Sequence, residues 1–308
     1  MGKKVCCHDS VKILVNTILS AILIVFAMVL ISVPAFASET TYDDDSKKNL
    51  DDTDVTYRIV GGGKERVNGN YFTVPKNKSS ESEPIVIILD NVNRSQVDKS
   101  PDKSFITIEE GNYVIIKLRG KNIIRAGENK QLGSNDGMSA LHVAKGSTMK
   151  VTSEEGDGSE SGSLEAYGGG GKYGGAGIGT RYNDDTGTII IAGGTIKATG
   201  GHSAAGIGSG RDGAAKKILI TGGNITAQGG DYGAGIGAGD NVDTGKGGDL
   251  YDLSITGGTV NASGGKSVAM MAKLAKEYDE AMIASNMAAD QDMLVVDPDT
   301  GEVIEPLK

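Results

Sequence analysis

The sequence predicts an all-β protein built around a parallel β-helix, in which short strands coil into stacked rungs. A Gly-Ile-Gly unit occurs three times, and its isoleucines, Ile178, Ile207 and Ile236, are spaced 29 residues apart each time. Two strand-like runs joined by a glycine pair recur between these units. Repeats of this length favour a solenoid, because each unit buries its apolar edge only by stacking on the next unit.

One repeat can be folded in outline from its residues. Ile218 and Ile220 point to the same side of one strand, because side chains alternate across a strand. The pair Gly222-Gly223 allows a sharp corner that needs an unrestricted φ angle. Ile225 and Ala227 then face inward from a second strand. This order of strand, corner and strand is typical of one rung of a parallel β-helix.

A third short strand closes the rung, with Ile236 facing inward. We expect stacking to place Ile196 over Ile225 and Ile225 over Val260, as an apolar ladder. The spacing is wider than a bare triangular rung requires, so we place the surplus in loops such as residues 211–217. A disordered glycine-rich linker is the alternative, and the strict recurrence of Ile and Val at equivalent places argues against it.

The chain upstream of the repeats also predicts strands. Its apolar runs have strand length, are rich in β-branched residues and lack a helical period. These runs are residues 85–89, 105–108, 113–118 and 122–124. We therefore place the solenoid at residues 54–265, with the glycine-rich repeats as its C-terminal part.

Residues 1–37 have the pattern of a secretory signal peptide. Three lysines precede an almost wholly apolar run at residues 13–33, and Ala35-Phe36-Ala37 supplies a small-x-small cleavage pattern. Cleavage there predicts a mature chain that begins near Ser38 and is secreted or held at the cell surface, with no membrane contact. The apolar run is long enough to span a bilayer, so an uncleaved anchor is the competing interpretation.

Cysteine usage and charge exclude several classes of function. Cys6 and Cys7 leave with the signal, so the mature chain has no disulfide, no thiolate nucleophile and no cysteine metal site. Removing three lysines and one aspartate from 31 basic and 40 acidic residues leaves 28 and 39, a net charge of −11. This balance disfavours phosphate polymers, so we expect no nucleic-acid partner.

The two ends of the mature chain differ from the repeats. Residues 38–53 are polar and rich in Asp, which predicts a disordered acidic linker. Residues 266–308 predict an amphipathic α-helix, followed by a hairpin whose strands flank the turn at residues 297–301. Such a cap would cover the open strand edges at the end of the solenoid. A partner-binding surface, or a linker to a longer protein, is the alternative for the helix.

A family resemblance covers well over half of the mature chain. The residues from 85 to 261 resemble secreted Gram-positive, glycine-rich parallel β-helix repeat proteins that are often labelled carbohydrate-binding. The resemblance depends on Ile88-Leu89-Asp90-Asn91-Val92, Leu118-Arg119-Gly120-Lys121-Asn122, Ala140-Leu141-His142-Val143, Gly162-Ser163-Leu164, and the Gly-Ala-Gly-Ile-Gly and Ile-Thr-Gly-Gly units. It implies a right-handed, pectate-lyase-like coil and supplies no catalytic residues.

Enzyme and metal chemistry have only weak candidates. Asn183-Asp184-Asp185 followed by His202 is superficially similar to polygalacturonases, where paired carboxylates hydrolyse the glycan. The Gly-Ile-Gly that follows His202 is the repeat consensus, however, and the separate upstream acid is missing. We therefore predict no enzyme activity, no cofactor and no metal, and expect His142 and His202 to be surface or loop residues. Calcium binding is the alternative to a chain without metal, because hard cations take oxygen ligands and several acids lie in the exit loops. These acids are Asp231, Asp240, Asp243 and Asp249.

Tyrosines give the functional hypothesis. A tyrosine ring offers a flat face to sugar C–H groups, while its hydroxyl and neighbouring carboxylates can hydrogen-bond sugar hydroxyls. The candidates are assigned to corners or exit loops of the repeats and are Tyr167, Tyr173, Tyr182, Tyr232 and Tyr251. We expect a non-catalytic, adhesin-like module that binds polysaccharide or glycoprotein glycans, or a host surface. A structural stalk without a ligand is the alternative, followed by a polysaccharide lyase or hydrolase.

Overall fold

The computed structural model describes most of the chain between Ser38 and Gly265, together with two short strands near the C-terminus. The described residues are 38–44, 46–62, 64–67, 70–96, 103–129, 136–154, 162–171, 173–241, 246–265, 295–296 and 303–304. The predicted signal peptide and the predicted C-terminal helix lie outside them. Within these ranges no helix is long and apolar enough to cross a membrane.

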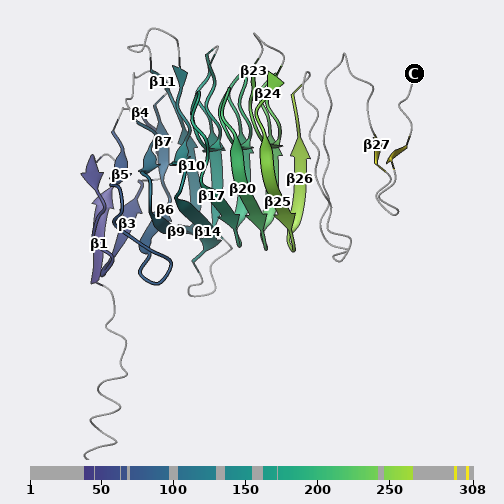
Figure 1. Cartoon of the computed structure of the whole chain (residues 1–308). Coiled ribbons are helices and arrows are strands. Elements are labelled where there is room, and N and C mark those ends of the chain that lie inside the picture. The colour runs from purple at the N-terminus through teal and green to yellow at the C-terminus, as the bar shows by residue number, and fades with distance from the viewer. Residues whose placement is uncertain are drawn as a thin grey trace, which may run out of the picture. The chain divides into compact units, whose positions relative to one another are not determined.

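The chain coils repeatedly through three sheets, and Figure 1 shows the strands of successive turns standing side by side from β1 to β26. Sheet A has eight strands, β1 (Ser38–Asp43), β3 (Val55–Val60), β6 (Ile85–Asp90), β9 (Tyr113–Arg119), β14 (Thr148–Ser153), β17 (Thr188–Ile191), β20 (Ala215–Ile220) and β25 (Leu250–Ile255). Sheet B has seven, β2 (Lys48–Asn49), β5 (Phe72–Val74), β8 (Ile106–Ile108), β13 (Leu141–Val143), β16 (Ile178–Gly179), β19 (Ile207–Gly208) and β22 (Ile236–Gly237).

Sheet C completes the cycle, because each turn from β6 onward runs through sheet A, then sheet C, then sheet B. Its seven strands are β4 (Arg66–Val67), β7 (Asn93–Ser95), β10 (Lys121–Arg125), β15 (Ser163–Tyr167), β18 (Thr195–Thr199), β21 (Asn224–Gln228) and β26 (Thr259–Ser263). Three short antiparallel pairs lie outside the three sheets, and they are β11 (Glu128–Asn129) with β12 (Asp136–Gly137), β23 (Asp240–Asn241) with β24 (Lys246–Gly247), and β27 (Val295–Val296) with β28 (Val303–Ile304). The architecture confirms the predicted all-β parallel β-helix.

The core is a stack of apolar ladders set by the strand register. Ile196 pairs with Ile225 and Ile225 pairs with Val260, as the sequence predicts, and all three side chains are fully buried. On sheet A, Ile189 lies beside Ile218 in the same way. Each rung therefore covers the apolar edge of its neighbour, and burial of apolar surface is the main favourable term in folding.

The strands of sheet B are short because the chain arches sharply through them. In three successive repeats an alanine N–H donates to the carbonyl four residues further on, at 2.9 to 3.2 Å. The donor and acceptor pairs are Ala176 with Thr180, Ala205 with Ser209, and Ala234 with Ala238. Each arch points one isoleucine inward, and the first two bring their last glycines, Gly179 and Gly208, against the backbone of the next rung.

The predicted linker at residues 38–53 is instead part of the solenoid. Strand β1 joins sheet A and β2 joins sheet B, and Leu50 is fully buried. Tyr42 packs against Tyr57 and Phe72, with ring centroids 6.3 and 6.1 Å apart. The polar composition misled the prediction, because pairing with an existing sheet satisfies the backbone of a strand that carries few apolar side chains.

The loop that was predicted at residues 211–217 is present but shorter than predicted. Ala215 and the two residues after it belong to β20, so the loop that follows β19 ends at residue 214 rather than 217. Ala215 is fully buried, which explains why the strand begins there.

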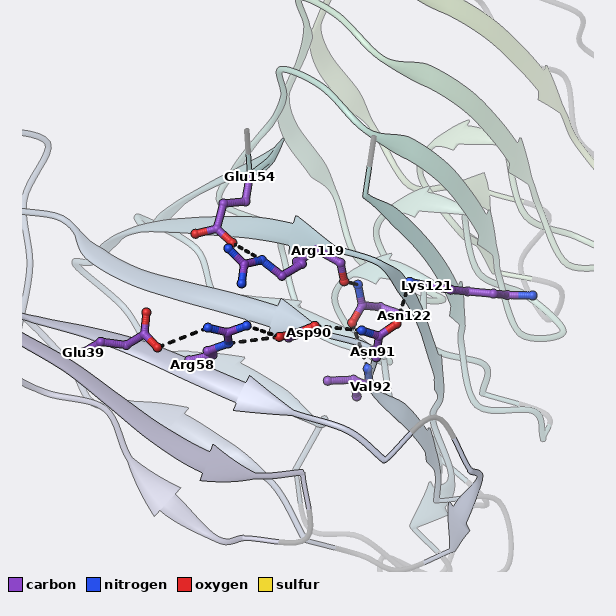
Figure 2. Close-up of polar contacts among 9 residues, drawn as sticks. All are labelled: Glu39, Arg58, Asp90, Asn91, Val92, Arg119, Lys121, Asn122 and Glu154. Carbon is purple, nitrogen blue, oxygen red and sulfur yellow. Dashed lines mark hydrogen bonds and ion pairs between the residues drawn. The ribbon is translucent and has the colours of Figure 1, made fainter. Parts of the chain in front are cut away.

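A buried asparagine fixes the corner between sheets A and C (Figure 2). Asn122 is fully buried, and its Oδ1 accepts a hydrogen bond from the Val92 N–H at 3.0 Å. Its Nδ2 donates to the carbonyls of Arg119 at 3.0 Å and Ser163 at 3.1 Å. One side chain thus joins three successive turns, and it supplies the acceptor for the buried Val92 N–H.

Charged residues near the same corner pair with one another, as Figure 2 shows. The Arg58 guanidinium donates to Asp90 from Nε at 3.0 Å and also from Nη2, and its Nη1 lies 3.3 Å from Glu39. Arg119 Nε lies 2.7 Å from Glu154. These pairs join neighbouring turns, so we interpret this cluster as structural.

We predict that Gly208→Ala destabilises the fold by about 3 kcal/mol or more, through strain at positive φ and overlap with the next rung. Gly208 has φ = 137°, and a Cβ there would lie 1.7 Å from the Gly237 carbonyl oxygen. The matched control is Gly193→Ala, where a Cβ meets nothing nearer than 3.4 Å. Urea unfolding measures the free energy of unfolding of both variants. Equal stability of the two would contradict the role assigned to the arch.

We also predict that Asn122→Ala lowers the free energy of unfolding by about 2–4 kcal/mol, because it leaves buried backbone groups without partners. Asn224→Ala, which alters an exposed asparagine of β21, should change it by less than about 0.5 kcal/mol. Thermal and urea unfolding of the two variants provide the comparison. A loss at Asn122 no greater than that at Asn224 would show that the corner does not depend on this side chain.

Candidate functional site

An open cleft of about 610 Å³ lies on the outer side of the solenoid, over sheet B. Its floor and walls come from several successive turns of the coil. The lining residues are Lys76, Lys103, Ser104, Thr107, Glu109, Glu110, Met138, His142, Ala144, Lys145, Arg181, Asn183, Asp184, Asp185 and Asp212. Cavities of this size are typical of sites for small ligands.

The register of sheet B places His142 at the floor of this cleft. Leu141 and Val143 of β13 are fully buried, so His142 between them points outward. It lies beside Thr107 on one side and Gly179 on the other. Because the next positions of this row are also glycine, His142 is the last side chain in the row before the face becomes bare backbone.

One rim of the cleft is held from below by buried hydrogen bonds. The Asn112 side chain is buried, and its Nδ2 donates to the carbonyls of Pro75 at 2.8 Å and Glu109 at 2.6 Å. The Ser147 hydroxyl donates to the same Glu109 carbonyl at 2.7 Å. These contacts fix the turn that carries Glu109 and Glu110 at the rim.

The opposite rim consists of two turns built alike in successive repeats. The Thr180 hydroxyl donates to the Asp184 carbonyl at 2.7 Å, and the Ser209 hydroxyl donates to the Gly213 carbonyl at 2.6 Å. In each turn the residue before the acceptor has a positive φ, 58° at Asn183 and 61° at Asp212. The repeat therefore positions polar side chains at a fixed spacing along this rim.

Acidic and basic side chains alternate along the cleft. Lys145 donates to Asp185 at 3.0 Å, and the Ala214 N–H donates to the other oxygen of that carboxylate, also at 3.0 Å. These two hydrogen bonds, that from Lys145 first, lower the pKa of Asp185. Arg181 Nε lies 2.9 Å from Asp184. The lining presents many hydrogen-bond donors and acceptors in one concave surface.

The imidazole of His142 is held in its neutral form. Burial lowers its pKa from 6.5 to about 4, because the charged form loses solvation. The negative charge of Asp184 opposes this shift, while the positive charge of Arg181 adds to it. At neutral pH the floor of the cleft therefore carries an uncharged ring that both donates and accepts hydrogen bonds.

Two of the predicted tyrosines meet beside this cleft. The rings of Tyr173 and Tyr182 have centroids 4.6 Å apart, and the guanidinium of Arg211 lies 4.6 Å from the Tyr173 ring centroid. Arg211 is almost fully buried, and the Tyr173 ring lies over its guanidinium. Arg181 and Asn183, which flank Tyr182 in the chain, both line the cleft.

The other three predicted tyrosines lie apart from this pair. Tyr232 packs edge-on against His202, with ring centroids 5.0 Å apart. Tyr167 ends β15 and donates to Glu165 at 2.7 Å, which lowers the pKa of that carboxyl. Tyr251 lies within β25 and is 62% exposed. Tyr167 and Tyr251 are therefore strand residues rather than corner or exit-loop residues as predicted, and the five do not form a single row.

Sequence reasoning identified only part of the cleft. It singled out Asn183, Asp184 and Asp185, which line the cleft, but grouped them with His202 rather than with His142. His142, expected to be a surface or loop residue, is an outward-facing, half-buried residue of β13. The partners of its row, Thr107 and Gly179, are 35 and 37 residues away, so the regular 29-residue spacing does not reveal them. The charged residues around it belong to loops whose lengths differ between turns.

The exit-loop acids considered for calcium have other contacts where they are described. Asp231 Oδ2 lies 3.0 Å from His202 Nδ1, and Asp249 accepts a hydrogen bond from the Tyr251 hydroxyl at 3.1 Å. Asp243 lies outside the described residues. Across the described ranges, no group of three or more His, Cys, Asp or Glu side chains is arranged to hold a metal ion.

The fold and its stacked register define a parallel β-helix repeat protein with a lateral cleft. A family model described as a Beta helix repeat matches residues 189–211, 218–240 and 253–272, which contain the last three copies of the strand pair. No match to the chain was found among curated proteins or among solved structures.

The pKa of His142 predicts a pH dependence of stability. The unfolded imidazole titrates near 6.5 and the folded one near 4, so below pH 6.5 the unfolded chain binds a proton that the folded chain does not. The contribution of neutral His142 to the free energy of unfolding is complete above pH 6.5. It is lost as the pH falls toward 4, by about 3 kcal/mol in all. Urea unfolding of the wild type and of His142→Gln across this pH range isolates the contribution of His142. The carboxylates titrate in both proteins, so their effect on the free energy of unfolding cancels in the comparison. Parallel pH curves for the two proteins would disprove the assignment.

Proposed function

We propose that this protein is a secreted or cell-surface, non-catalytic β-helix module that binds glycans at the cleft over sheet B. The observation that carries the proposal is the Tyr173–Tyr182 pair beside a concave surface of mixed donors and acceptors. Aromatic rings stack on the apolar faces of sugars, and carboxylates, amides and imidazole rings hydrogen-bond their hydroxyls. The pattern of residues 1–37 supports export.

The geometry of the rim supports binding with little rearrangement. Hydrogen bonds to backbone carbonyls fix the turns on both sides, through Asn112 on one rim and through Thr180 and Ser209 on the other. A preorganised site loses less conformational entropy when a ligand binds. A solenoid that repeats such turns also suits an extended polymer better than a single small molecule.

The state of Asp185 does not suit the general acid of a glycoside hydrolase. Glycoside hydrolysis requires a carboxylic acid that keeps its proton near neutral pH in order to protonate the leaving group. Hydrogen bonds from Lys145 and from the Ala214 N–H lower the pKa of Asp185, so this carboxyl is a carboxylate at neutral pH. Asp185 is thus suited to accept hydrogen bonds from sugar hydroxyls.

The test is retention of the purified chain on immobilised mucin, peptidoglycan and plant polysaccharides. We expect saturable retention that falls about tenfold in Tyr182→Ala, since one aromatic–sugar contact is worth about 1–1.5 kcal/mol. Tyr251→Ala is the matched control, because it removes the most exposed of the described tyrosines, from strand β25 of sheet A, and should leave retention unchanged. Thermal unfolding confirms that both variants are folded.

Three other outcomes would contradict the proposal. Absence of retention on every polymer would favour a structural stalk that acts through its length alone. Release of new reducing ends or unsaturated sugars from any of the polymers would instead make the protein a polysaccharide hydrolase or lyase. An equal loss of retention in the two tyrosine variants would place the binding surface outside the cleft.

A further inference from the structure

The charges of the cleft also indicate which class of glycan it accepts, an inference that rests on the proposed function. Each described basic side chain that lines the cleft lies within 3.2 Å of an acidic side chain that lines it too. The pairs are Lys76 with Glu110 at 3.2 Å, Lys103 with Glu109 at 2.8 Å, Lys145 with Asp185 at 3.0 Å, and Arg181 with Asp184 at 2.9 Å. The cleft thus has paired charges along its length.

The balance of charge in the lining is slightly negative. Four basic side chains face five acidic ones, because Asp212 lines the cleft as well, so the formal charge of the described lining is −1. Asp212 lies 3.6 Å from Arg211, which is almost fully buried and has the Tyr173 ring over its guanidinium. That guanidinium is therefore not presented to a ligand in the cleft.

His142 adds no positive charge at neutral pH. The groups that face it are Asp184, Arg181, Lys103 and Glu109, two acidic and two basic. Their charges offset one another, and burial then decides in favour of the neutral ring.

We propose that the cleft binds neutral, polyhydroxylated glycans and discriminates against uronate, sulfated or phosphorylated ones. The positive charge of each basic side chain is already offset by its carboxylate partner, so the side chain offers a polyanion little net attraction. The carboxylates stay in the cleft whether or not they remain paired, so the net charge that the ligand meets is negative. Like charges at close range are repulsive, and a concave surface with low-dielectric walls strengthens that repulsion.

Neutral hydroxyl groups meet no such barrier. A sugar hydroxyl donates one hydrogen bond and accepts others, so it can join a carboxylate and a neighbouring ammonium group without separating them. The 610 Å³ cleft offers such pairs on both rims, with neutral His142 on the floor between them. Binding of this kind should also depend little on salt, because no net charge is neutralised.

The experiment compares a neutral β-glucan with polygalacturonate of matched chain length, each titrated into the purified chain at two salt concentrations. We expect the β-glucan to bind with a dissociation constant that changes less than about twofold with salt, and polygalacturonate to bind about tenfold more weakly or not at all. A gain-of-function variant sharpens the test. Glu110→Gln/Asp184→Asn frees Lys76 and Arg181, changes the formal charge of the lining from −1 to +1, and should bind polygalacturonate at low salt.

The matched control is Asp249→Asn/Asp252→Asn, which removes two acids in and next to β25 and should not gain polygalacturonate binding. Tighter binding of polygalacturonate than of β-glucan by the wild type, weakened by salt, would overturn this inference while leaving glycan binding intact. Binding of neither polymer by the folded wild type would refute the proposed function and this inference with it.

Discussion

The structure depends on one constraint, which is that each rung must lie in register with the rung before it. The hydrogen bonds of the three sheets run between rungs, so a rung has almost no stability of its own. In-register stacking also places isoleucine beside isoleucine along the core, as at Ile189 and Ile218. The glycines of the sheet B arches follow from the same requirement, because a side chain at Gly179 or Gly208 would overlap the next rung.

That constraint produces the cleft as a consequence. Where the row along sheet B changes from Thr107 and His142 to glycine, the outer surface loses its side chains. Loops that follow successive rungs then stand around the remaining groove, each held by hydrogen bonds from a buried or half-buried polar side chain. A repeat that is nearly uniform in its core thus becomes specific at its surface, because only the loops differ from turn to turn.

The electrostatic character of the site has the same origin. Stacked loops bring lysines from one turn within reach of acids on another turn, as for Lys76 with Glu110 and Lys145 with Asp185. Pairing of this kind contributes little stability at an exposed surface. It does determine what a ligand meets, which is a row of hydrogen-bonding groups with almost no net charge.

The sequence by itself determined the solenoid, its inward ladders and its glycine corners, because the strand pair that contains Ile196, Ile225 or Val260 recurs in each rung. It also pointed to Tyr173 and Tyr182, although not to their contact with each other and with Arg211. Only the tertiary structure placed His142 at the floor of a cleft and Leu50 in the core. The physical reason is that local periodicity fixes which way a side chain faces, whereas loops of unequal length and strands of polar composition acquire neighbours only when the rungs stack.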